Sequence, residues 1–190
     1  QIYERLRKSS LFDRKLKMYK VNADLSSQSE EIGRTRIFPR GWLENESVWL
    51  HMQYKYLLEV LRSGLFAEFY QTFKEVIIPF SNPAVYGRSI LENSSFIVSS
   101  AHEDKNLHGQ GFVARLSGST AEFLHLWLLM NVGPKTFHWD NKKGLTLTFK
   151  PALAGWLFTK EARDIVIVDK MQGKKTVCLP KNTYAFNFLS

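Results

Sequence analysis

The stretch LHGQGFVARLSGSTAEFLHLWLLMNVG, residues 107–133, joins a polar segment rich in glycine to an apolar run. Ser119 and Glu122 match the S-x-x-E capping box, in which a hydroxyl and a carboxylate each accept a hydrogen bond from a free backbone N–H. The Gly-Pro pair at 133–134 is typical of a helix end. The stretch therefore predicts a buried helix over residues 119–132 that begins directly after a loop.

The first turn of such a helix has free N–H groups and the positive end of the helix dipole, which together attract anions. Ser117, Gly118 and Ser119 lie at this end of the expected helix. Two interpretations stay open from these residues alone: a phosphate-binding turn, or a cap that only starts a core helix. Capping boxes are much commoner than phosphate sites, so local sequence favours the second interpretation.

Two further helices are expected earlier in the chain. Residues 44–63 are apolar over most of a helix circumference, with Asn45 as the N-cap, and such a helix is buried among others. Residues 65–78 carry one apolar stripe, and the short connection at Gly64 predicts an antiparallel hairpin. His51 lies within the first helix, either as a core histidine satisfied by a hydrogen bond or as a polar group that points into a site.

A long irregular segment, residues 79–118, connects the second expected helix to the third. Loops of this length are uncommon in compact domains and frequently bind ligands. Several of its side chains are of types that contact substrates. The candidate substrate-binding residues are Tyr86, Arg88, Glu92 and Arg115.

The apolar pattern changes to alternation after residue 135, which predicts β-strands. The expected strands are 145–149, 164–168, 174–179 and 184–189. This order, helices and then strands, predicts a mainly α-helical domain over residues 1–134 and an incomplete antiparallel β-domain over residues 135–190. No strand is expected before residue 135.

The composition limits the classes of function. The 190-residue chain has a net charge of +8 and is 44% hydrophobic, enough for a sizeable core. Seven basic residues lie between Arg5 and Lys20, but without a nucleic-acid-binding module a solvated face or a surface for an acidic partner is favoured. The single cysteine, Cys178, and the lack of a signal peptide or transmembrane run predict a cytoplasmic protein that contacts neither membrane nor nucleic acid.

Three segments together resemble the C-terminal part of glycoside hydrolase family 94, the cellobiose and chitobiose phosphorylase group. Glu44 and Asn45 followed by His51 resemble an E-N-x-x-x-x-x-H segment, in which a helical histidine binds phosphate. Residues 116–121, LSGSTA, are similar to L-T-G-T-A-A, whose hydroxyl and amide groups bind phosphate. Residues 141–156 resemble the D-G-L-x-I-x-P-x-L-P-x-W stretch that opens a C-terminal β-sheet.

The resemblance covers roughly residues 40–160 and implies a fold and a reaction. The fold is the last helices of an α/α toroid of the six-hairpin type, followed by a small antiparallel C-terminal β-layer. The reaction is inverting phosphorolysis of a β-glycosidic bond: a carboxylic acid protonates the glycosidic oxygen while phosphate attacks from the opposite face, giving a sugar 1-phosphate. The implied phosphate-binding residues are His51, Ser117, Gly118 and Ser119, with inorganic phosphate as co-substrate and neither cofactor nor metal.

The general acid of that family, an Asp in a D-W-N-D type motif, has no counterpart in the chain, because the pair Trp139-Asp140 lacks its context. We therefore expect a C-terminal fragment with no catalytic residue of its own, inactive in isolation. Its expected partners are a carbohydrate substrate, phosphate and the missing N-terminal part of the same protein. A partial toroid exposes the apolar faces of its helices, so self-association is also expected.

Other functions stay open. A non-catalytic carbohydrate-binding module would use aromatic stacking platforms, although core positions are the alternative for these side chains. The aromatic candidates are Trp42, Trp49, Tyr86 and Trp139. A glycoside hydrolase of the same fold is a further alternative, and nucleic-acid binding through the basic N-terminal region would be marked by steep salt dependence.

Overall fold

The computed structural model of the chain describes residues 1–113, 118–169, 171 and 173–188. It divides into two compact units, an N-terminal unit of Gln1–Trp127 and a C-terminal unit of Leu128–Ser190. The division falls within helix α5 (Gly118–Asn131), whereas the sequence pattern indicates a boundary after residue 134.

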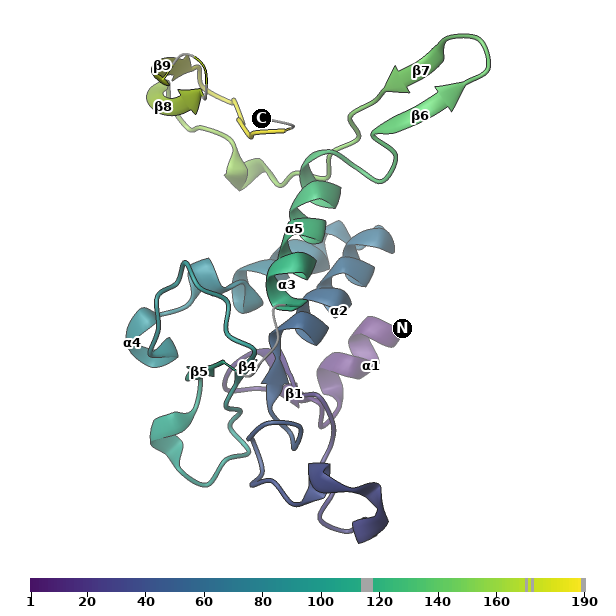
Figure 1. Cartoon of the computed structure of the whole chain (residues 1–190), viewed down its shortest axis with the longest axis vertical. Helices are drawn as coiled ribbons and strands as arrows, with labels where there is room; N and C mark the ends of the chain where they lie inside the picture. The colour runs from purple at the N-terminus through teal and green to yellow at the C-terminus, as the bar shows by residue number, and fades with distance from the viewer. Residues whose placement is uncertain (114–117, 170, 172, 189–190) are drawn as a thin grey trace. The chain divides into compact units, whose positions relative to one another are not determined.

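The N-terminal unit is built around a helical hairpin (Figure 1). Its helices are α1 (Ile2–Lys8), α2 (Leu50–Arg62), α3 (Phe66–Val76), α4 (Pro83–Tyr86) and the first part of α5. The chain turns between α2 and α3 at Gly64, whose φ of +74° favours glycine. Buried side chains recur every three or four residues on both helices, and the ring centroids of Phe69 and Phe73 lie 5.5 Å apart.

The described residues of the N-terminal unit also form five short strands, β1 to β5. β1 (Phe12–Asp13) pairs antiparallel with β2 (Met18–Tyr19), and a three-stranded antiparallel sheet has the order β3 (Val48–Trp49), β4 (Phe96–Ile97), β5 (Gly111–Phe112). Trp49 and Phe96 face one another in register, and Val98 completes this buried cluster. The ring of Trp42 covers it, with its centroid 5.2 Å from that of Phe96.

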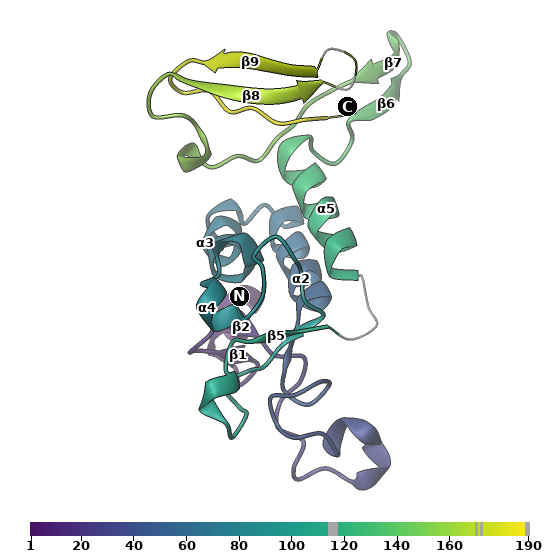
Figure 2. The same ribbon diagram turned by 60° about the vertical axis from the view of Figure 1, so that its left-hand side comes forward.

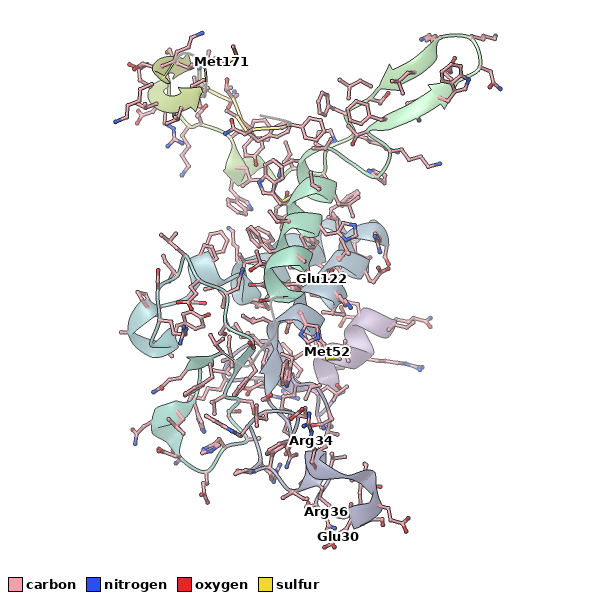
Figure 3. All side chains as sticks on the ribbon, viewed as in Figure 1. Glu30, Arg34, Arg36, Met52, Glu122 and Met171 are labelled. Atoms are coloured by element: carbon pink, nitrogen blue, oxygen red, sulfur yellow. The ribbon has the colours of Figure 1, made fainter. Side chains whose placement is uncertain are left out.

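A loop with two 3-10 turns, η1 (Glu30–Ile32) and η2 (Arg34–Arg36), precedes the sheet (Figure 3). A guanidinium nitrogen of Arg34 lies 2.6 Å from a carboxylate oxygen of Glu44, and one of Arg36 lies 3.5 Å from Glu30. The remaining 3-10 turns are η3 (Ile78–Phe80), η4 (Lys105–Leu107) and η5 (Gly155–Leu157).

The C-terminal unit contains the end of α5 and two hairpins: β6 (Phe137–Asp140) with β7 (Gly144–Leu147), and β8 (Arg163–Asp169) with β9 (Gly173–Leu179). The register pairs Phe137 with Leu147 and Trp139 with Leu145, so these apolar side chains share one exposed face. The hydroxyl of Tyr184 donates to the side-chain carbonyl of Asn131 at 2.6 Å, which fastens the last segment to the end of α5.

The structure contradicts the predicted fold class. The described residues form five helices and nine strands in four small antiparallel sheets, and they do not make a clear α/α toroid. Strands β1 to β5 all lie before residue 135, where none was expected, and β3 lies inside the segment assigned to the first long helix. The reason is tertiary: strands of two residues cannot show alternation in the sequence, and aromatic pairs such as Trp49 with Phe96 stabilise them across the sheet.

The start of the first long helix was also predicted wrongly. α2 begins at Leu50, because Val48 and Trp49 pair with β4 and Glu46 has a φ of +57°, which no helix accommodates. Asn45 is not an N-cap, since its side-chain amide donates to the carbonyl of Phe38 at 2.7 Å. The competing sheet pairing therefore shortens the helix from its N-terminal side.

The predicted capping box of Ser119 and Glu122 is also wrong. α5 begins at Gly118, so Ser119 lies inside the first turn, and Glu122 forms an ion pair with Lys55. The predicted helices at 65–78 and 119–132 are nevertheless confirmed as α3 and α5, with ends that differ by one or two residues.

The trailing strands are confirmed as β7, β8 and β9, whereas residues 184–188 form no strand. Across the described ranges, no helix has both the length and the apolar character needed to cross a lipid bilayer.

Candidate anion-binding site

His51 lies in the first turn of α2, because this helix begins at Leu50 directly after β3. The backbone N–H of Leu50 donates to the carbonyl of Ser95 at 3.1 Å, so the edge of the sheet fixes the position where the helix starts. The first N–H groups of a helix have no partner within it. The imidazole is therefore held at the positive end of α2.

Gly118, the first residue of α5, lies against the same imidazole. A methyl group on Gly118 would lie 3.4 Å from the Cβ atom of His51, 3.7 Å from Cγ and 3.9 Å from Cδ2. Without a side chain at residue 118, the backbone of the first helical turn faces the ring directly. The structure thus brings His51 to the first turn of α5, which a shared phosphate site requires.

Contacts along the two helices show that α2 and the first part of α5 run parallel. Lys55 Nζ lies 3.7 Å from a carboxylate oxygen of Glu122, and the Arg62 guanidinium lies 3.2 Å from Nε2 of His125. These pairs follow the His51–Gly118 contact in the same direction on both helices, which lie side by side in Figures 1 and 2. Figure 3 marks Glu122 on α5 and Met52 on α2. Two positive helix ends therefore meet at His51.

The environment of His51 keeps the imidazole neutral. Burial lowers the pKa of His51, the Lys55 ammonium lowers it further, and only the Glu122 carboxylate acts in the opposite direction. The ring of Trp49 meets the imidazole edge-on, with centroids 5.8 Å apart. Within the part of the chain that the structure describes, neither ring nitrogen has a hydrogen-bond partner. A neutral imidazole in this position can donate one hydrogen bond to an anion.

Ser119 connects the site to the long loop. Its side chain is buried, and its hydroxyl donates to the carbonyl of Ser94 at 3.3 Å. The hydroxyl is thus used within the protein, while the backbone N–H of Ser119 belongs to the first helical turn, whose N–H groups have no partner within the helix. Ser117 lies outside the described residues, so the structure does not address its predicted role.

The loop that ends at Ser94 is organised by Tyr86, a predicted substrate-binding residue. Only 1% of Tyr86 is exposed, and its hydroxyl donates to the carbonyl of Glu92 at 2.9 Å and accepts from the N–H of Ser94 at 2.7 Å. Burial raises the pKa of this phenol, so the hydroxyl keeps its proton. Gly111 packs beneath the ring, where any Cβ would lie 2.2 Å from a ring carbon of Tyr86.

The other predicted substrate-binding residues have different surroundings. Arg88 and Glu92 form an ion pair with one another on the loop surface. Arg115 lies outside the described residues. The structure therefore gives Tyr86 a direct role in shaping the loop, and the contact of Arg88, Glu92 and Arg115 with a substrate stays a prediction.

The aromatic candidates are mostly core residues. Trp49 and Tyr86 are buried, and Trp42 is half-buried against Phe112. Trp139, in the C-terminal unit, is 73% exposed and is the one stacking platform of this set that is open to solvent.

Sequence reasoning missed a buried carboxylate in the N-terminal unit. Only 1% of Glu46 is exposed, and its carboxylate binds the ammonium of Lys20 at 2.6 Å and the guanidinium of Arg40. The density of basic residues before Lys20 was the available signal, but the sequence could not show that a buried carboxylate would face them. Among the described residues, no group of three or more His, Cys, Asp or Glu side chains could hold a metal ion.

Comparison with protein-family models, with curated proteins and with solved structures gives no match to this chain. The geometry and chemistry of the described residues therefore carry the functional argument.

Proposed function

We propose that the chain is the phosphate-binding part of a carbohydrate-active enzyme, an inverting phosphorylase of β-linked disaccharides or oligosaccharides that releases a sugar 1-phosphate. One observation carries this proposal: the imidazole of His51 lies against Gly118, between the first turns of two parallel helices. The resemblance of residues 44–51 and 116–121 to phosphate-binding segments of glycoside phosphorylases supports the same assignment.

The proposed chemistry needs this kind of site. In inverting phosphorolysis, phosphate replaces the water that a hydrolase activates with a carboxylate, so the protein must bind a dianion and hold it in line with the glycosidic carbon. Free N–H groups at Gly118 and Ser119 would bind phosphate oxygens at about 2.7–3 Å. A ring N–H of His51 would bind a further oxygen.

Neutral His51 suits a site that must also release its ligand. A cationic imidazole in a partly buried position would hold phosphate more tightly, but burial and Lys55 disfavour that form. An arriving dianion favours the imidazolium, so binding should raise the pKa of His51 and take up part of a proton. The affinity of this site for the phosphate dianion should therefore increase as the pH falls towards 6.

The carboxylic acid that protonates the leaving group would come from sequence outside the 190 residues, since the motif that supplies it in glycoside phosphorylases is absent here. The isolated chain should therefore bind phosphate without cleaving a glycosidic bond. A cytoplasmic location is part of the proposal, and the free, exposed Cys178 is compatible with a reducing compartment.

The proposal is tested by isothermal titration calorimetry of inorganic phosphate into the chain, with His51→Ala as the variant and His125→Ala as the control. His125 is an exposed histidine on α5 whose ring contacts Arg62, away from the helix start. We expect saturable binding that His51→Ala weakens about tenfold, the effect of one lost charge-assisted hydrogen bond, and that His125→Ala leaves unchanged. Equal binding by all three proteins would contradict the proposal.

In the complete enzyme, the phosphorylase and its alternatives give different products. A phosphorylase releases sugar 1-phosphate from a β-disaccharide only when phosphate is present, whereas a hydrolase releases free sugar without phosphate. A carbohydrate-binding module binds oligosaccharides without either product, and its binding would depend on the exposed Trp139.

A further inference from the structure

A cavity of about 510 Å³ opens on the N-terminal unit, apart from the His51 site. Its wall comes from the end of α1 and the next turn, from β1 and the turn after it, and from Lys20, Arg40 and Ser100. The lining contains five cationic side chains and one carboxylate: Lys8, Arg14, Lys15, Lys20 and Arg40 with Asp13. The volume lies in the range of small-molecule sites.

The one carboxylate of the lining is used inside the protein. Asp13 is buried, and its oxygens accept from the N–H groups of Lys15 and Leu16 at 3.0 Å and from the N–H and hydroxyl of Ser100 at 2.6 and 2.9 Å. All four donors belong to backbone or hydroxyl groups, and Asp13 forms no ion pair with a described cation of the lining. Asp13 instead fixes the turn on which Arg14 and Lys15 stand.

Two of the five cations already have carboxylate partners. Lys20 and Arg40 share the buried carboxylate of Glu46, and Arg40 also lies 3.3 Å from Asp24. Lys8 and Arg14 are exposed and have no ion pair with any described residue. Among the described residues, the cations of the lining without a carboxylate partner are therefore Lys8, Arg14 and Lys15.

Lys15 is held in place by a buried histidine. Its ammonium lies 2.8 Å from Nδ1 of the buried His108, and Nε2 of His108 lies 2.7 Å from the carbonyl of His102. A carbonyl only accepts, so Nε2 carries the imidazole hydrogen and Nδ1 accepts from Lys15. The histidine is thus a neutral acceptor that positions the ammonium, which keeps two N–H donors for a ligand.

From this arrangement we infer that the cavity is a second anion site, which binds a small organic phosphate with at least two negative charges. Three cations without carboxylate partners match a phosphate ester or diphosphate better than a monoanion, because each can bind a separate oxygen. Phe12 supplies an apolar wall for the organic part, with Arg7 covering the ring at 4.7 Å from its centroid. The inference is independent of the function proposed for His51.

The test measures binding of two probes, inorganic pyrophosphate and glucose 6-phosphate, to the intact chain by calorimetry at 150 mM salt. At this ionic strength diffuse surface charge is largely screened. We expect saturable binding of both, and about tenfold weaker binding for Lys8→Gln and for Arg14→Gln. Stronger binding of the ester than of pyrophosphate would support a contribution from the organic part, and the reverse would overturn the assignment to an organic phosphate.

Control variants distinguish binding in this cavity from nonspecific attraction to the basic surface and from binding at the His51 site. Lys105→Gln removes an exposed cation that does not line the cavity, and His51→Ala alters the other site; both should bind pyrophosphate as the unmodified chain does. Circular dichroism checks that each variant is folded. Three further outcomes would overturn the inference: no saturable binding of either probe, equal loss with Lys105→Gln and Lys8→Gln, or binding of duplex DNA alone.

Discussion

His51 and Gly118 lie in contact at the first turns of α2 and α5, whose first part runs parallel to α2 in the N-terminal unit. Neither residue indicates a site alone, since glycine is common before a helix and histidine occurs in many cores. Their contact places a neutral imidazole beside the first backbone N–H groups of α5, which is an arrangement suited to an anion. The first prediction concerns the glycine.

Gly118→Ala should fold normally, because the added methyl group meets the Cβ atom of His51 at 3.4 Å, an ordinary van der Waals distance. The change in unfolding free energy should stay within about 1 kcal/mol. Gly118→Leu, in contrast, must displace the imidazole and should destabilise the chain by about 1–3 kcal/mol. Urea unfolding followed by tryptophan fluorescence distinguishes these outcomes; equal stability of both variants would contradict the contact.

The second prediction concerns the buried carboxylate of Glu46. Glu46→Gln leaves the ammonium of Lys20 and the guanidinium of Arg40 without their shared counter-charge and should destabilise the chain by about 2–4 kcal/mol. Glu30→Gln is the matched control, because Glu30 is exposed and 3.5 Å from Arg36, and it should change stability by at most about 0.5 kcal/mol. Similar urea midpoints for the two variants would show that Glu46 is not buried.

The third prediction concerns the loop that ends at Ser94. Tyr86→Phe removes a buried hydroxyl that bonds the carbonyl of Glu92 and the N–H of Ser94, and should destabilise the chain by about 1–3 kcal/mol. Because Ser94 also holds Ser119, loosening of the loop should increase hydrogen exchange of the Ser119 amide. Unchanged exchange there, with a lower stability, would separate the loop from the anion site.

The fourth prediction concerns alkaline pH. Burial raises the pKa values of Tyr54, Tyr56 and Tyr86, so these phenols stay protonated in the folded chain while the same groups ionise in the unfolded chain near pH 10. Stability is therefore fully present below about pH 10 and should fall as the pH rises above it. Tyrosinate absorbance at 295 nm should rise together with unfolding; ionisation of all tyrosines in a folded chain would contradict this burial.

Some of the fold can be read from the sequence. The apolar stripe of residues 66–76 and the apolar run after Ser119 predict α3 and α5, and alternation predicts β8 and β9, because in each case the pattern repeats over several residues. The sheet β3–β4–β5 could not be predicted, since each strand has two residues and depends on partners far away in the chain. The same sheet explains why α2 begins at Leu50 and why the predicted fold class was wrong.

The candidate site could be predicted from the sequence only in part. A histidine in an apolar helix is unusual enough to select His51, but only the fold shows that the Gly118 backbone meets the imidazole. Tyr86 was selected by residue type, and its burial could not be foreseen because it depends on Gly111 of β5, which lies against the ring although it is far from α4 in the sequence. Residue type thus identifies polar groups that could bind a ligand. Contacts between distant parts of the chain decide which of these groups are buried in contacts within the protein.

The most direct test of the central claim is a proton NMR titration of the His51 ring with and without inorganic phosphate, with His125 as the internal control. Burial lowers the pKa of His51, so without phosphate its ring should titrate below the usual value of about 6.5, and stability should fall as the pH drops through that range. Phosphate should raise the pKa of His51 and shift the amide resonances of Gly118 and Ser119, while the amide resonance of His125 should not move. A phosphate concentration of about 50 mM is far above the dissociation constant expected of a working site. An unchanged His51 titration and unchanged amide resonances of Gly118 and Ser119 at this concentration would contradict the account.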